Sequence, residues 1–262
     1  MPIPRWRGPA FTTQGGFPVT LARADRLRRE IEHGATATAV RQAEAGWDSA
    51  AGRIRRERRI AFLVAGLPRA ARVLEIGAGT GLQTANLLES LDDVTGIDIS
   101  PELLSIARDR APGATYRVMD AHAPEFPAAT FDAVLGVSIL HHLDWDIALE
   151  AYFRVLKPGG IVRFSEPNLL NPQIYVQKNV PWLKRLAGDS PDEYAFTQRQ
   201  IARLLMRIGY TGISVRPFEF LHPGTPESLI GFVVKLEEWA SRTALNAIAG
   251  SLLIEARKPA AP

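Results

Sequence analysis

The stretch Val73-Leu74-Glu75-Ile76-Gly77-Ala78-Gly79-Thr80-Gly81-Leu82 decides the fold. An apolar run typical of a buried strand leads into three glycines at alternate positions, and a helical pattern follows. Glycine lets the backbone turn sharply and lets a ligand approach main-chain atoms that a side chain would block. In an open α/β sheet, such a turn lies at the carboxyl ends of the strands, where ligands bind.

The spacing of these glycines distinguishes two kinds of nucleotide ligand. Dinucleotide-binding enzymes use Gly-x-Gly-x-x-Gly and rest a pyrophosphate on the helix N-terminus. Here the third glycine comes one residue earlier, and Glu75 stands two residues before the first. A carboxylate at that position is unfavourable beside a diphosphate but favourable near the ammonium or sulfonium of S-adenosylmethionine (SAM). The loop therefore predicts SAM as the cofactor.

Acidic residues end the next two expected strands. Asp98 is positioned to accept hydrogen bonds from both ribose hydroxyls of an adenosyl ligand. Asp98 could instead cap the helix that starts at Pro101, but Ser100 suits that role better. Asp120 can accept a hydrogen bond from an adenine amino group, and the next backbone amide can donate one to a ring nitrogen. A loop-capping role for Asp120 stays open.

Short apolar runs alternate with helical stretches over most of the chain. We expect strands at residues 72–76, 94–97, 114–118, 133–137, 161–164, 213–218 and 252–257. We expect helices at residues 81–90, 101–110, 147–156, 198–208 and 226–249. Strands that alternate with helices of this length predict an α/β fold with a mostly parallel sheet and helices on both faces.

Taken together, these segments resemble the class I SAM-dependent methyltransferase superfamily, especially its small-molecule branch of ubiquinone and menaquinone methyltransferases. The resemblance covers roughly residues 45–168. It implies a Rossmann-like sheet of seven strands, the last of them antiparallel. It also implies a SAM pocket, whose expected residues are Glu75, Gly77, Ala78, Gly79, Gly81, Asp98, Ile99, Asp120, Ala121, His122, Val137 and Ser138.

The helix before the glycine loop is expected to close this pocket, as it does in many relatives. Trp47 could cover the methionine part of SAM, or it could only anchor the helix as a buried tryptophan. Arg53 or Arg56 could meet the SAM carboxylate.

The chain divides into an N-terminal extension with a helical cap, residues 1–67, and a SAM-binding domain, residues 68–262. Two further segments are expected within that domain. Residues 168–196 form an irregular lid segment, and residues 226–249 form an inserted amphipathic helix. The aromatic side chains of the first segment suit either an acceptor lid or a small core; they are Tyr175, Trp182, Tyr194 and Phe196.

A general base is needed for a hydroxyl or acidic carbon acceptor, whereas an amine or a preformed anion needs none. The candidates are His141, His142, Glu166 and His222. His141 and His142 are adjacent, so at most one of them is expected to reach the substrate. A packing role is open for each histidine, and Glu166 could cap Asn168 instead. We expect O-methylation slightly ahead of N- or C-methylation.

Composition excludes several kinds of site. The 262 residues are 46% hydrophobic and 23% charged, and there is no cysteine, which removes disulfides, thiolate metal sites and a cysteine nucleophile. Asp144 and Asp146 are expected to start a helix rather than to hold a cation, so no required metal is predicted. Without a secretory signal or a run of about 18 apolar residues, we expect a soluble cytoplasmic protein, monomeric or homodimeric.

Three alternatives stay open. The arginine-rich run at residues 53–59 favours a nucleic-acid methyltransferase, but it also suits a solvated helix face. Against nucleic acid, Ser138-Ile139-Leu140-His141 stands where base-amino methyltransferases place Asn/Asp-Pro-Pro-aromatic to hold a flipped base. The second alternative is a SAM-binding protein without transfer activity. The third is a lipid-linked acceptor, with residues 226–249 lying on a membrane, although that helix has no strongly basic face.

Overall fold

A computed structural model describes residues 46–180 and 195–260 of the chain. Its centre is a seven-stranded sheet with the spatial order β3-β2-β1-β4-β5-β7-β6. The strands are β1 (Arg72–Ile76), β2 (Asp93–Asp98), β3 (Thr115–Val118), β4 (Phe131–Val137), β5 (Leu156–Pro167), β6 (Thr211–Phe218) and β7 (Ser251–Arg257). Among the strands of the described residues, only β7 runs antiparallel to its neighbours, as the resemblance implied.

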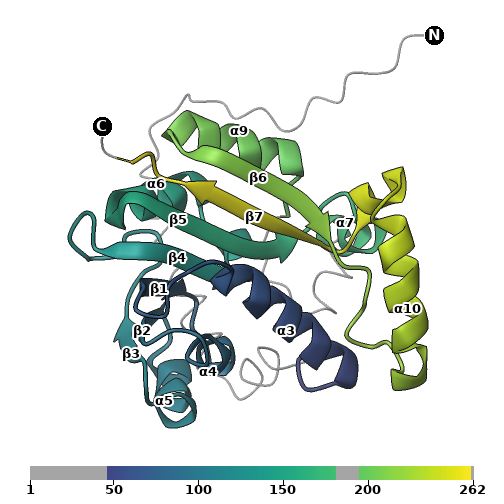
Figure 1. Cartoon of the computed structure of the whole chain (residues 1–262), viewed down its shortest axis with the longest axis horizontal. Helices are drawn as coiled ribbons and strands as arrows, with labels where there is room; N and C mark the ends of the chain where they lie inside the picture. Colours follow the sequence, from purple (N-terminus) through teal and green to yellow (C-terminus); the bar gives the residue numbers. More distant parts are fainter. Residues whose placement is uncertain (1–45, 181–194, 261–262) are drawn as a thin grey trace.

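Helices cover both faces of this sheet (Figure 1). They are α3 (Ala50–Val64), α4 (Leu82–Leu87), α5 (Pro101–Arg110), α6 (Trp145–Val155), α7 (Pro172–Asn179), α9 (Gln198–Ile208) and α10 (Glu227–Ala240), with the short 3-10 helices η1 (Leu140–His142) and η2 (Ala244–Ile248). Helices α3, α4 and α5 pack on one face, and α6 and α9 pack on the other. The predicted α/β fold with a mostly parallel sheet is therefore confirmed.

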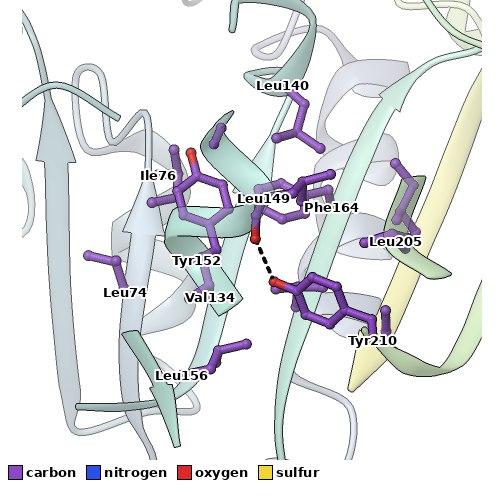
Figure 2. Close-up of a cluster of buried hydrophobic side chains, with 14 of the residues drawn as sticks. Leu74, Ile76, Val134, Leu140, Leu149, Tyr152, Leu156, Phe164, Leu205 and Tyr210 are labelled. Carbon is purple, nitrogen blue, oxygen red and sulfur yellow. Dashed lines mark hydrogen bonds between the residues drawn. The ribbon is translucent and has the colours of Figure 1, made fainter. Parts of the chain in front are cut away.

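Alternation along the strands explains the two cores. In β1, Leu74 and Ile76 point into the core under α6 and α9, while Val73 points towards α3 and α4. Figure 2 shows the first core, where the Tyr210 hydroxyl donates a hydrogen bond of 3.0 Å to the carbonyl of Leu149. This bond ties α6 to the residue just before β6. It satisfies a phenol that would otherwise be buried without a partner.

Several expected boundaries differ from the structure by a few residues, and three expectations differ more clearly. Strand β5 begins at Leu156 because Gly159, at φ 79°, lets a bulged segment join the sheet before Ile161. The segment expected to be irregular contains α7, whose N-cap Asn171 accepts hydrogen bonds from the backbone amides of Gln173 and Ile174. The expected helix over residues 226–249 ends at Ala240 and is followed by η2.

Helix α10 exposes more apolar side chains than a helix that only packs against the fold would. Ile230 and Ala240 are buried, and Val233 and Val234 are half-buried. Four further apolar side chains of this helix are exposed; these are Leu229, Phe232, Leu236 and Trp239. Among the described residues, no helix is long and apolar enough to cross a bilayer.

Candidate functional site

The glycine loop follows β1 and turns back into α4. Gly77, Gly79 and Gly81 have φ values of 70°, 51° and 76°, in the left-handed region that favours glycine. A Cβ atom on Gly77 would lie 2.7 Å from Ile139, and one on Gly81 would lie 2.8 Å from the backbone of Ala107. A Cβ on Gly79 would meet nothing within 4 Å, so the main chain there is open to a ligand.

Asp98 lies beside this loop at the end of β2. One carboxylate oxygen accepts a hydrogen bond of 2.9 Å from the Gly79 amide, and the other accepts one of 3.0 Å from the Ser100 amide. Ser100 caps α5 through Leu103, as expected from the sequence. Burial raises the pKa of Asp98 above its ordinary value, although the backbone amides oppose that shift.

Glu75 is almost fully buried under the loop. Its carboxylate accepts a hydrogen bond of 2.6 Å from the Thr84 hydroxyl on α4. Burial raises the pKa of Glu75 to about 8, and the nearby Asp98 adds to the increase. Two carboxylates in this environment favour a cationic ligand, because a positive charge would stabilise their ionised forms.

The end of β3 is held by a histidine. Asp120 accepts hydrogen bonds from the backbone amide of His122, at 2.9 Å, and from its ring Nδ1, at 2.7 Å. The Nε2 of the same ring accepts from the Asp144 amide at 2.8 Å. His122 therefore fixes the loop after β3 against the start of α6, while Ala121 packs on the central core.

Residues after β4 form a second turn next to the glycine loop. Ser138 has a positive φ of 53°, which is uncommon outside glycine, and its amide donates to the Ser165 carbonyl at 2.8 Å. Val137 packs on the core under α3 and α4. Glu166, at the end of β5, reaches back to this turn and contacts His141 at 2.8 Å.

His222 lies apart from these histidines, after β6. Its Nδ1 accepts a hydrogen bond of 3.1 Å from the Gly224 amide, so in the neutral ring the proton is on Nε2. Burial lowers the pKa of His222, and Arg55 lowers it further. This geometry disfavours His222 as a general base.

The start of α3 reaches the same edge of the sheet. Trp47 lies against Arg55 and Arg59, whose guanidinium carbons are 5.8 Å and 5.3 Å from its ring centroid. Arg56 donates to the Trp47 carbonyl at 3.1 Å. These contacts bring the two expected cap residues, Trp47 and Arg56, together.

Three arginines of the run at residues 53–59 form ion pairs with other parts of the chain. Glu219 accepts from Arg55 at 2.8 Å and from the buried Arg59 at 2.6 Å, and Arg58 pairs with Glu237 at 3.1 Å. A fully solvated face, one of the two interpretations of this run, is therefore wrong for Arg59.

The four aromatic residues expected in an acceptor lid or a small core differ in their surroundings. Phe196 is 1% exposed and stacks on Trp145 at 5.0 Å, so it belongs to the core. Tyr175 is exposed on α7. Trp182 and Tyr194 lie outside the described residues, as does the expected N-terminal extension up to residue 45.

In the part of the chain that the structure describes, no group of three or more acidic, histidine or cysteine side chains could hold a metal ion.

Comparison with known proteins agrees with this arrangement. Residues 74–164 match the family model described as a methyltransferase domain. This part of the chain is therefore similar to a methyltransferase domain.

Two curated relatives are named as menaquinone or ubiquinone methyltransferases. The demethylmenaquinone methyltransferase of Tropheryma whipplei is 34% identical over 157 residues, which are 55% of this chain and 64% of that protein. The ubiquinone/menaquinone biosynthesis C-methyltransferase UbiE of Cellvibrio japonicus is 31% identical and covers 55% of this chain and 65% of its own length. The chain thus spans slightly less than two thirds of either relative.

Solved structures share the fold over a longer part of the chain. Phosphoethanolamine N-methyltransferase 2 of Haemonchus contortus, in complex with SAM, has a TM-score of 0.60 at 20% identity and covers 86% of this chain and 57% of its own. The N-methyltransferase NodS of Bradyrhizobium japonicum, bound to S-adenosylhomocysteine, has a TM-score of 0.57 at 18% identity and covers 90% of this chain and 97% of its own. The prediction of a class I methyltransferase fold is confirmed.

Proposed function

We propose that this chain transfers a methyl group from SAM to a small-molecule acceptor. The observation that carries the proposal is the open main chain at Gly79, next to the carboxylate of Asp98. The residues fit SAM, because the ligand can approach the loop without meeting a side chain and both nearby acids favour its positive charge.

Within this proposal, each part of the loop system has a separate task. Asp98 accepts from the ribose hydroxyls, with Ile99 beside the adenine, and Gly77, Ala78, Gly79 and Gly81 let the ligand lie against the main chain. Glu75 favours the positive end of SAM. Asp120, Ala121 and His122 hold the adenine edge, and Val137 and Ser138 form the wall towards the acceptor. Trp47 and Arg56 close the methionine end.

SAM supplies a methyl carbon on a positive sulfur, and the carbon–sulfur bond breaks with both electrons staying on sulfur. The chain aligns the acceptor with that carbon and keeps water away. The quinone-directed relatives and the absence of a base-holding Asn/Asp-Pro-Pro-aromatic turn support a small acceptor over nucleic acid. The attacked atom, a cytoplasmic location and a monomeric or homodimeric state stay predictions.

A transfer assay tests the proposal. The protein is incubated with methyl-labelled SAM and separately with naphthohydroquinone, catechol, phosphoethanolamine and transfer RNA. We expect label in at least one small acceptor and none in the RNA. Label only in the RNA would favour the nucleic-acid alternative. Binding of SAM without label in any acceptor would favour a SAM-binding protein without transfer activity.

A further inference from the structure

Exposed apolar side chains are concentrated on α10 and on η2, which follows it. In the part of the chain that the structure describes, eleven large hydrophobic side chains are exposed, and six of these lie within residues 229–248. They are Leu229, Phe232, Leu236 and Trp239 on α10, with Leu245 and Ile248 on η2. Apolar surface that is gathered in one place commonly marks a binding surface.

The four α10 residues form a single stripe along the helix. They are spaced by three, four and three positions, which places them on one side of α10. Phe232 is 67% exposed and Trp239 is 56% exposed, so both aromatic rings present much of their surface to the outside. Figure 1 shows α10 at the end of the sheet, away from α9.

Another side of α10 is held by the fold. Ile230 packs in a small buried cluster with Ala51 of α3 and with Leu221. Glu237 accepts a hydrogen bond of 3.1 Å from Arg58, which is also on α3. These contacts fix the rotation of the helix, and the stripe therefore faces outwards.

Basic residues flank the stripe. Lys235 lies three positions after Phe232 and four positions before Trp239, and Arg242 lies three positions after Trp239. Residues at these spacings are neighbours on a helix surface. Lys235 and Arg242 are both exposed, and neither forms an ion pair with another described residue.

The acidic residues of α10 lie on its other sides. Glu227 and Glu238 are three or four positions away from none of the four stripe residues, and Glu237 is paired with Arg58. Counted over its whole length, the helix has no strongly basic face. The charge directly beside the stripe is nevertheless positive.

We propose that α10 and η2 dock the chain on the surface of a lipid bilayer that carries anionic head groups. The stripe enters the boundary between head groups and acyl chains, where the rings of Phe232 and Trp239 are favourable. Lys235 and Arg242 extend beside it to the lipid phosphates. The helix lies along the surface and does not cross the bilayer, and this binding is independent of methyl transfer.

Docking in this way brings a particular edge of the sheet to the bilayer. Strand β7 begins at Ser251, directly after η2, and Ser251 pairs with Pro167 at the carboxyl end of β5. The glycine loop follows β1, which runs parallel to β4 and β5 and ends at the same edge. The docked surface and the proposed SAM loop therefore share one edge of the sheet.

A second copy of the chain suits the stripe less well. In a two-fold pair of antiparallel α10 helices, each flank of the helix faces the same flank of the other copy. Lys235 and Arg242 would then lie against basic residues, which repel each other. An anionic surface instead pairs with both.

Flotation with vesicles tests the docking. The full chain is mixed with vesicles of phosphatidylcholine alone, or of phosphatidylcholine and phosphatidylglycerol in equal parts, and each mixture is centrifuged through a density gradient. We expect the protein to float with the anionic vesicles, to float less with the neutral ones, and to leave the anionic vesicles in part at high salt. Absence of flotation with the anionic vesicles would overturn the proposal.

The double variant Phe232→Gln, Trp239→Gln tests the stripe. Because both side chains are exposed, we expect an unchanged urea unfolding midpoint, and affinity for anionic vesicles lower by on the order of 100-fold. The matched control Met206→Gln removes an exposed apolar side chain from α9 and should leave flotation unchanged. Undiminished flotation of the folded double variant would show that another part of the chain binds, against the proposal.

Reversing the charges beside the stripe tests the flank. We expect Lys235→Glu with Arg242→Glu to lose the preference for anionic vesicles and to keep the weaker binding to neutral ones. The matched control reverses two exposed arginines of α9, Arg199→Glu with Arg203→Glu, and changes the net charge by the same amount. An equal loss in both pairs would mean that net charge alone attracts the protein, which would overturn the role of the flank.

Tryptophan emission reports where the chain enters the bilayer. We expect the emission to shift to shorter wavelength when anionic vesicles are added. Trp239→Phe should abolish that shift but still float, because phenylalanine keeps the apolar contact. A shift that persists in Trp239→Phe would place the contact at another tryptophan and would contradict docking through α10.

Sedimentation velocity without lipid tests the second copy as the occupant. We expect the unaltered protein and the variant Phe232→Gln, Trp239→Gln to have the same oligomeric state. A dimer of the unaltered protein that is lost in this variant would assign the stripe to a second copy and would overturn the lipid surface as its partner.

Discussion

Two carboxylates beside one loop, the buried Glu75 and the half-buried Asp98, cost free energy on folding when no ligand is bound. Glu75 and Asp98 both have a raised pKa, and each loses hydration on folding. Hydrogen bonds from Thr84 and from backbone amides offset part of that cost. A cationic ligand would offset more of it, which gives these residues a reason to be acidic.

Replacing Glu75 by glutamine should make stability less dependent on pH. Below its ordinary pKa of 4.5, Glu75 is protonated in both the folded and the unfolded protein. Between pH 4.5 and about 8, Glu75 keeps its proton only in the folded protein. The unaltered protein therefore loses stability as pH rises through that window. We expect Glu75→Gln to be more stable than the unaltered protein above it, by on the order of a few kcal/mol.

Urea unfolding at several pH values, without SAM, measures this difference. The exposed Glu89, which follows α4, provides the control, because Glu89→Gln should change stability little at any pH. A stability difference between Glu75→Gln and the unaltered protein that does not vary with pH would contradict the buried, protonated state of Glu75.

At the residue scale, local patterns were predictable and long-range contacts were not. The helix cap Ser100 was predicted because the strand end and the helix start are close in sequence. The role of Asp98 in binding ribose stays a prediction. The contact between Glu166 and His141 depends on β4 and β5 lying side by side, and no neighbouring residue signals it. For the same reason, the pairing of Arg59 with Glu219 was missed.

At the element scale, the start of α3 depends on one glycine. A Cβ on Gly52 would lie 1.8 Å from the carbonyl oxygen of Gly46 and 2.8 Å from the backbone of Trp47. The turn before the helix crosses directly over Gly52, and Ser49 caps the helix on its amide. The sequence pattern predicts only a helix in this region, because the close approach of the turn to Gly52 leaves no sign in the neighbouring residues.

We expect Gly52→Ala to destabilise the fold by about 2–3 kcal/mol and to weaken SAM binding, because the turn that carries Trp47 must move. The helical Gly231 of α10 is the matched control, since a Cβ there meets nothing within 4 Å. Gly231→Ala should stabilise the protein by about 0.5–1 kcal/mol through helix propensity. Chemical denaturation measures the free energy of unfolding of both variants. Equal changes in the two variants would contradict the close approach of the turn to Gly52.

Elements with a regular period were predicted best. The bounds expected for β1, α5 and α9 agree with the structure, because each has a clear start and stop in its sequence. Helix α7 was missed although Asn171 and Pro172 form a recognisable helix start, since its apolar residues are sparse and none of its residues is buried. The break between α10 and η2 has no proline to mark it.

At the scale of the whole molecule, the sheet brings every proposed site residue to one edge. The parallel strands β1, β2, β3, β4 and β5 end at the same edge, so the loops after them meet even though they are far apart in sequence. The start of α3 and the segment after β6 reach the same edge through the contacts of Arg55 and Arg59 with Glu219. We therefore expect the acceptor to bind beyond the end of β4, on the side of the sheet that holds β5, β7 and β6.

Isothermal titration of S-adenosylhomocysteine into the protein tests the central claim most directly. We expect saturable binding, and about 100-fold weaker binding for Asp98→Ala, because charged hydrogen bonds to the ribose are lost. Asp93→Ala, at the opposite end of the same strand and exposed, should bind as the unaltered protein does. Absence of binding, or undiminished affinity in Asp98→Ala, would contradict the account.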